Sequence, residues 1–149
     1  MKPPMFWQPL TGSKAQQYLQ RAQMFMDAAI PLSDYAHAQQ NWPKYALLTH
    51  AIELSLKAFA DHSVATGKPP PVTEPEQHDL SGWYKLALQY GLRDEPGVSQ
   101  NIDILNELHL THYTRYPQHS ANPLPGASVI ASSTVEHLIS TVTQSINPR

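Results

Sequence analysis

Cysteine is absent from the chain's 149 residues, and this absence excludes a disulfide framework, a thiolate nucleophile and a zinc–thiolate site. Charge is sparse as well, with 15% charged residues and a formal net charge of -2. A chain with this charge has no overall attraction for a phosphate backbone. Any contact with nucleic acid must therefore come from a local cluster of basic side chains.

Long hydrophobic runs are also missing. The first ten residues, MKPPMFWQPL, contain three prolines and are too short to be the apolar region of a signal peptide. No later run approaches the length of a membrane span. These features predict a cytoplasmic protein that makes no contact with a membrane.

Glycine-rich phosphate loops, internal repeats and paired strand patterns are missing too, and apolar residues recur at helical spacing instead. The fourteen prolines gather between these periodic segments, where they mark loops. We therefore expect five helices. They run from a cap at Ser13 to about residue 30, from a cap at Asn41 to before Gly67, from a cap at Asp79 to before Gly91, from about Ser99 to Thr114 or Arg115, and from a cap near Ser132 or Ser133 onward.

Length and composition favour one domain over residues 1–149, with an N-terminal arm at 1–12 and a helical bundle at 13–147. The arm carries Phe6 and Trp7, which we expect to pack on the body. Residues 93–98 and 117–131 are expected to be loops. Helices joined by loops of this length pack antiparallel, so the predicted fold is an all-α, antiparallel four-helix bundle with an additional C-terminal helix.

The stretch 45–60, YALLTHAIELSLKAFA, is the expected centre of this bundle. Its apolar residues fall on two adjacent stripes, and a helix that is apolar around most of its circumference is one on which others pack. The narrow remaining face, here called the polar strip, carries His50, Glu53 and Lys57. Glu53 precedes Lys57 by one turn, which is the favourable order for a helical ion pair. In the simplest interpretation the polar strip is a solvated face.

The densest polar site lies at 109–119, HLTHYTRYPQH, here called the histidine–arginine cluster. In a phosphodiester site Arg115 would stabilise charge on a phosphate oxygen, with His119 as the first choice of general acid or base and His112 as the second. The alternative is that His109 and His112 are hydrogen-bonded on a half-buried stripe while Arg115 contacts the last carbonyls of its helix. The polar residues of the cluster are His109, His112, Tyr113, Arg115, Tyr116 and His119.

A metal site needs more ligands than the sequence brings together. His109 and His112 are three residues apart and could share a helix face. Helical bundles that bind two metal ions use Glu-x-x-His on paired helices, and that pattern is missing here. We therefore predict no metal ion and no other cofactor.

Three short motifs follow one another along the chain: Ala-x-Glu-x-x-x-Lys-Ala at 51–58, His-Asp-Leu at 78–80 and Arg-Tyr-Pro at 115–117. In this order the motifs resemble those of HEPN domains, a small all-α family of prokaryotes and eukaryotes, and the resemblance covers about residues 15–117. The resemblance implies an antiparallel helical bundle that is often a dimer. It also implies one of two functional subclasses.

One HEPN subclass consists of metal-independent endoribonucleases, frequently toxins, whose Arg-x4–6-His motif forms a composite site across the dimer. The other lacks this motif and binds nucleotides or RNA, or serves as a partner module, commonly with a minimal nucleotidyltransferase. Here Arg115 matches the motif arginine, and Tyr116 replaces the asparagine that commonly follows it. His119 follows Arg115 after only three residues, outside the family spacing, and Pro117 breaks the helix that would aim both side chains.

This departure favours a non-catalytic, HEPN-like homodimeric module that binds a nucleotide, RNA or a protein. The residues implied in binding are Arg115, Tyr116, Tyr113, His109, Lys57, Glu53 and His50. The alternative is a toxin-like, metal-independent ribonuclease that uses Arg115 with His119 or His112. The resemblance also places the polar strip beside the helix of Arg115, so we expect Glu53 and Lys57 to be partly buried, with Glu53 or His50 holding a polar group of a neighbouring helix.

Overall fold

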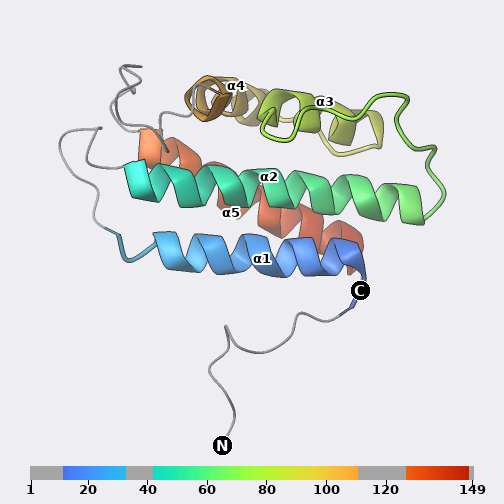
Figure 1. Cartoon of the computed structure of the whole chain (residues 1–149), viewed down its shortest axis with the longest axis horizontal. Helices are drawn as coiled ribbons and strands as arrows, with labels where there is room; N and C mark the ends of the chain where they lie inside the picture. Colours follow the sequence, from blue (N-terminus) through green and yellow to red (C-terminus); the bar gives the residue numbers. More distant parts are fainter. Residues whose placement is uncertain (1–11, 33–41, 111–126, 148–149) are drawn as a thin grey trace, which may run out of the picture.

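The structure is a computed structural model that describes residues 12–32, 42–110 and 127–147. These residues form five helices and no strand (Figure 1). The expectation of an all-α chain is confirmed for this part of the sequence, whereas the predicted docking of Phe6 and Trp7 lies outside it. The helices are α1 (Lys14–Ala29), α2 (Trp42–Ala65), α3 (Leu80–Gln89), α4 (Pro96–Leu110) and α5 (Ala127–Ile146).

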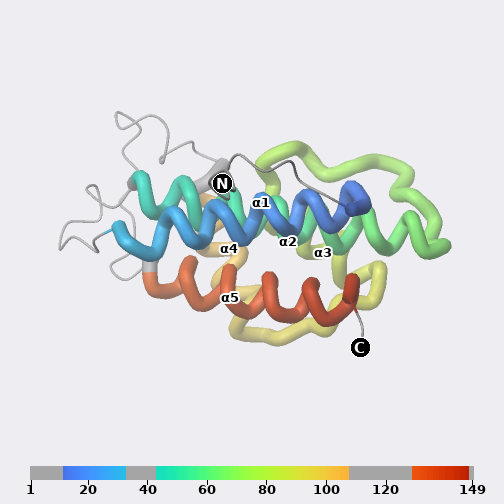
Figure 2. Tube along the Cα trace, turned by 90° about the horizontal axis from the view of Figure 1, so that it is seen from below, coloured from blue at the N-terminus to red at the C-terminus, as the bar shows by residue number. Residues whose placement is uncertain are grey.

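Helix α2 lies at the centre and contacts each of the other four described helices. Helix α1 runs antiparallel along one side of α2, and α3 and α4 cover the opposite side (Figure 1). Helix α5 packs against both α1 and α2, and Figure 2 shows it beside α1. No helix among the described residues has the length and apolar character needed to cross a membrane.

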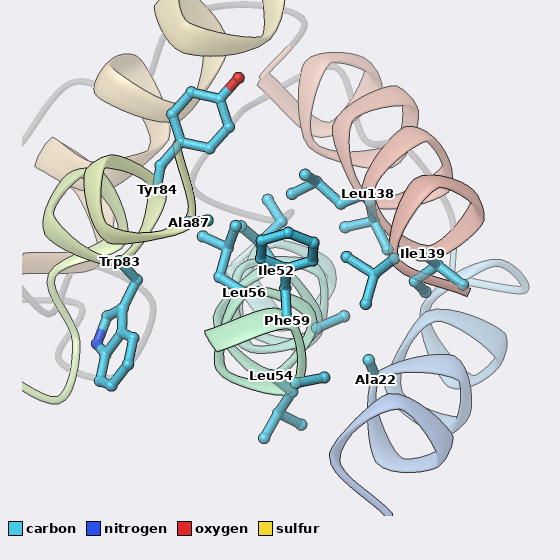
Figure 3. Packing of buried hydrophobic residues seen from close by; sticks show 14 of the residues in the cluster. Ala22, Ile52, Leu54, Leu56, Phe59, Trp83, Tyr84, Ala87, Leu138 and Ile139 are labelled. Carbon is cyan, nitrogen blue, oxygen red and sulfur yellow. The ribbon is translucent and has the colours of Figure 1, made fainter. Parts of the chain in front are cut away.

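Both apolar stripes of α2 are buried, as the sequence predicts, because neighbours surround the helix. Figure 3 shows Ile52, Leu56 and Phe59 of α2 between residues of α5 and α3. Polar residues are also buried within α2, where the hydroxyls of Ser55 and Ser63 donate to carbonyls four residues earlier and so remain satisfied without water. The buried apolar residues of α2 are Tyr45, Leu48, Ala51, Ile52, Leu54, Leu56, Ala58, Phe59 and Ala60.

The predicted helix caps at Ser13 and Asp79 are confirmed. The Ser13 hydroxyl accepts from the Gln16 backbone N–H while the Gln16 side chain accepts from the Ser13 N–H, which forms a capping box. The Asp79 carboxylate accepts from the Gly82 N–H at 3.0 Å. These bonds satisfy N–H groups that have no partner within their own helix.

Glycine ends α2 and α3 as predicted. Gly67 and Gly91 have φ values of +114° and +102°, a conformation that only glycine adopts without strain. After Gly91 the Leu92 N–H bonds back to the Ala87 carbonyl at 2.9 Å, which is the hydrogen bond of a Schellman motif. The glycine conformations therefore determine where α2 and α3 end.

The expected starts of the last two helices are wrong by several residues. Helix α4 begins at Pro96 rather than near Ser99, because proline fits the first turn, where its missing N–H costs nothing. Helix α5 begins at Ala127 rather than at Ser132 or Ser133. Its first turns bury Ala131 fully, and this packing outweighs the local preference of serine for a cap position. The predicted end of α4, at Thr114 or Arg115, lies outside the described residues.

The connection from α3 to α4 is held by Tyr84. Its hydroxyl donates to Asp94 Oδ1 at 3.2 Å, and the Ser99 hydroxyl donates to the same oxygen at 2.7 Å. Burial of the ring raises the pKa of Tyr84 above its ordinary value of 10.0. The unfolded chain therefore loses this proton before the folded chain does.

We expect the free energy of unfolding to fall as pH rises above about 10, because the folded state then binds more protons than the unfolded state. The contribution of Tyr84 is intact below that pH and is lost as pH passes through its raised pKa. Urea unfolding at about pH 9 and pH 11 measures it. Tyr84→Phe lacks the ionising group, so its stability should decline less with pH, and equal declines in both proteins would contradict the prediction.

Candidate functional site

The polar strip of α2 is organised around one buried carboxylate. Glu53 is 1% exposed, and its Oε2 lies 3.2 Å from the Lys57 ammonium. Its Oε1 lies 2.9 Å from Nδ1 of His78, which precedes α3. The Nδ1 of His50 lies 3.9 Å from Oε2. The carboxylate therefore meets one ammonium and two imidazoles, from α2 and from the turn before α3.

Helical spacing explains how the three residues of the polar strip meet, since positions three and four residues apart lie on one face. Neighbouring elements cover that face. The rings of His50 and of Phe25 in α1 form a T-shaped pair with centroids 4.5 Å apart, and the Lys57 ammonium lies 5.3 Å from the centre of the Trp83 ring of α3. The interpretation of the strip as a solvated face is therefore wrong, and the expected burial of Glu53 and Lys57 is confirmed.

The bond between Glu53 and His78 fixes the tautomer of the imidazole. When Glu53 is ionised as the partner of the Lys57 ammonium, its carboxylate only accepts hydrogen bonds, and the 2.9 Å contact then requires an N–H at Nδ1 of His78 as the donor. In the neutral ring Nε2 is then the acceptor. Glu53 is enclosed, whereas the side chains of His78 and Lys57 are 23% and 15% exposed. The His50 side chain is 33% exposed, so a ligand would reach this network through His50, His78 or Lys57.

A second set of hydrogen bonds continues the network into α4. The Asn106 side-chain oxygen accepts from the Leu80 backbone N–H at 2.7 Å, and its amide nitrogen donates to Asp79 Oδ1 at 3.1 Å. Asp79 caps α3 through Gly82, where a Cβ would lie 2.5 Å from the carboxylate. Through these bonds α2, the turn at 78–80 and α4 are fixed relative to one another.

Only part of the predicted site falls among the described residues. The structure brings together His50, Glu53 and Lys57. His109 belongs to the last turn of α4, but its side chain lies outside the described part of the chain. The residues that lie wholly outside it are His112, Tyr113, Arg115, Tyr116 and His119.

Three members of the network, His78, Asp79 and Asn106, are absent from the predicted site, and Asp79 is predicted only as a helix cap. His78 is visible in the sequence as the first residue of His-Asp-Leu, but nothing local pairs it with Glu53. Asn106 directly follows the buried Leu105 on α4. A polar residue on a buried helix face needs a hydrogen-bond partner, and this signal is present in the sequence.

Comparisons of the chain with protein families, with curated proteins and with solved structures find no match. Within the residues that the structure describes, no group of three or more His, Cys, Asp or Glu side chains is arranged to hold a metal ion. The network can fix the turn before α3 and present His78 and Lys57 to a ligand.

Proposed function

We propose that this chain is a non-catalytic binding module of the HEPN type, which acts as a homodimer and uses the region around Arg115 to bind a nucleotide or RNA. The fold proposed with it is the antiparallel four-helix bundle of that family. Helices α1 to α4 would form the bundle, and α5 would be the additional helix.

One observation carries the proposal. The first two of the three segments that give rise to the resemblance, 51–58 and 78–80, lie far apart in sequence yet contact one another, whereas the third, 115–117, lies outside the described residues. Glu53 of the first motif contacts Lys57 of the same motif and His78 of the second, and the next residue, Asp79, contacts Asn106 of α4, the helix that precedes Arg115 in the sequence. Residues that share one network are expected to recur together in a family.

Binding is favoured over catalysis by the order of residues after α4. His119 follows Arg115 after three residues, and Pro117 stands between them. A general acid and a phosphate-binding cation have to be aimed at the same phosphate. A proline between them ends the helix that would hold both side chains in register.

Filter binding of a single-stranded RNA across salt concentrations tests the proposal. The wild-type protein is expected to bind with an affinity that falls as salt rises, and Arg115→Ala should bind more weakly. Its slope of log affinity against log salt should be smaller by about 0.7 for each phosphate that the variant no longer neutralises. Arg93→Ala, at an exposed arginine between α3 and α4, is the matched control and should behave as wild type.

Three outcomes would count against the proposal. Equal, weak binding by wild type and Arg115→Ala would refute nucleotide or RNA binding, and capture of a nucleotidyltransferase-type protein would then favour a partner module. RNA cleavage that persists in EDTA and disappears in Arg115→Ala and His119→Ala would instead establish the ribonuclease. A mass by light scattering of one 16.7 kDa chain, rather than two, would refute the homodimer.

A further inference from the structure

A groove of about 410 Å³ opens beside the polar strip, between α1, α2, α3 and the proline-rich segment 68–77. This volume lies within the range of about 300–1,000 Å³ typical of small-molecule sites. In Figure 2 the segment runs along the side of α2 opposite α5. The groove therefore lies on the outside of the bundle, where a ligand can enter.

Two aromatic residues, Trp83 in α3 and Tyr90 at the C-terminal end of α3, hold the proline-rich segment that forms one wall of the groove. The Trp83 indole N–H donates to the Glu76 carbonyl at 3.0 Å, and the Tyr90 hydroxyl donates to the Pro69 carbonyl at 2.8 Å. Figure 3 shows the Trp83 side chain projecting from α3 away from α5. Because both rings are anchored by hydrogen bonds, the groove exists before any ligand binds.

The groove carries charges of both signs. Among its described lining residues, Lys14 and Lys57 are basic and Asp61 and Glu74 are acidic. Lys57 is the least exposed of these four charged residues, and its ammonium is bonded to Glu53 and placed over the Trp83 ring. Asp61 follows Lys57 by one helical turn, and its carboxylate is 3.9 Å from the exposed Lys14 ammonium.

These charges restrict the ligand. The ammonium of Lys57 has three N–H donors, and the side chain is largely shielded from water, so an anionic group that reaches it gains a charge-assisted hydrogen bond. A bare anion or a nucleic acid would also meet Asp61 and Glu74. A simple cation would meet the two lysines, which already lie near the Trp83 and Tyr18 rings.

We propose that this groove binds a small zwitterion with an apolar body, of the chemistry of a free apolar amino acid. Its carboxylate pairs with Lys57, its ammonium with Asp61 or Glu74, and its side chain packs against the rings of Trp83 and Tyr90. The site does not rest on the function proposed above: Lys57 is also among the residues that the resemblance implies in binding, but the groove is formed by α1, α2, α3 and the segment 68–77 rather than by the region around Arg115.

Titration calorimetry with L-phenylalanine tests the proposal, together with two probes that each lack one charge. Phenylpropanoate lacks the ammonium and phenylethylamine lacks the carboxylate. L-Phenylalanine is expected to bind in the millimolar range or tighter, and each truncated probe at least about tenfold more weakly. The Trp83 indole N–H resonance should shift on binding, which places the ligand in the groove.

Three variants distinguish this site from surface binding. Lys57→Met keeps the aliphatic stem and removes the charge, and it should weaken binding of L-phenylalanine at least about tenfold. Val64→Trp fills the groove from a partly exposed position and should abolish binding even if Lys57→Met proves unstable. Lys85→Met, at an exposed lysine of α3 outside the groove, should bind as wild type.

Absence of binding by L-phenylalanine, L-leucine and L-methionine at millimolar concentration would overturn the proposal. Equal binding of phenylpropanoate would reduce the site to an anion site, and equal binding of phenylethylamine would reduce it to a cation site. Loss of RNA binding in Arg115→Ala with unchanged amino-acid binding would separate this site from the region around Arg115.

Discussion

Glu53→Leu is expected to lower the free energy of unfolding by about 3 kcal/mol, near the lower end of the cost of breaking a buried ion pair. The carboxylate of Glu53 is the acceptor for both Lys57 and His78. Its removal leaves an ammonium and an imidazole N–H that are largely shielded from water and without this acceptor. Urea unfolding followed by far-UV circular dichroism measures the loss as a lower midpoint at an unchanged slope.

A double-mutant cycle with Lys57→Met identifies the cause. If the cost is that of a stranded charge, Lys57→Met should be far less harmful in the Glu53→Leu background than in the wild type, with a coupling of about 1–3 kcal/mol. Glu136→Leu, at an exposed position of α5, controls for the change of residue type and should alter stability by less than about 0.5 kcal/mol. Additive effects of the two substitutions would show that Glu53 and Lys57 act independently.

Asn106→Ala is expected to lower the free energy of unfolding by about 2–3 kcal/mol, because it leaves the buried Leu80 N–H without its acceptor. The substitution also removes the hydrogen bond from the Asn106 side-chain amide to Asp79, which is the cap of α3. The substitution thus loosens the attachment of α3 to α4 and the start of α3 together. Hydrogen exchange should show faster exchange of the Leu80 and Gly82 amides.

Asn101→Ala is the matched control for this prediction, since Asn101 is a half-buried residue of the same helix and gains the same helix propensity on replacement by alanine. It should leave stability unchanged or raise it slightly. A second variant, Asn106→Asp, keeps the acceptor for Leu80 but sets its carboxylate beside that of Asp79. Its stability should improve as pH falls and the repulsion is removed, and a loss independent of pH would contradict the proposed geometry.

The helices themselves are largely predictable because the signals that form them are local. The apolar period over 45–60, the caps at Ser13 and Asp79 and the glycines Gly67 and Gly91 each act within one or two turns. The misplaced starts of α4 and α5 show the limit of such signals. For α4 the sequence offers two local signals for the helix start, Pro96 and Ser99, and the helix begins at Pro96. For α5 the helix begins at Ala127 because its first turns bury Ala131.

For the polar strip, as for the helices, some properties could be predicted from the sequence and others depended on the tertiary structure. The sequence determined that His50, Glu53 and Lys57 share one face of the central helix, because helical spacing alone brings them together. It also determined that Asp79 caps α3. Whether that face meets water or protein depends on which elements pack on it, and no local pattern contains that information.

Only the tertiary structure decided that His78 is the partner of Glu53 from 25 residues away, and that Asn106 joins the same network from 27 residues beyond Asp79. It likewise decided that Lys57 borders a groove with Trp83. The physical reason is that the contacts of a side chain and its exposure to water follow from the packing of distant segments, whereas helical periodicity and capping follow from neighbours in the chain.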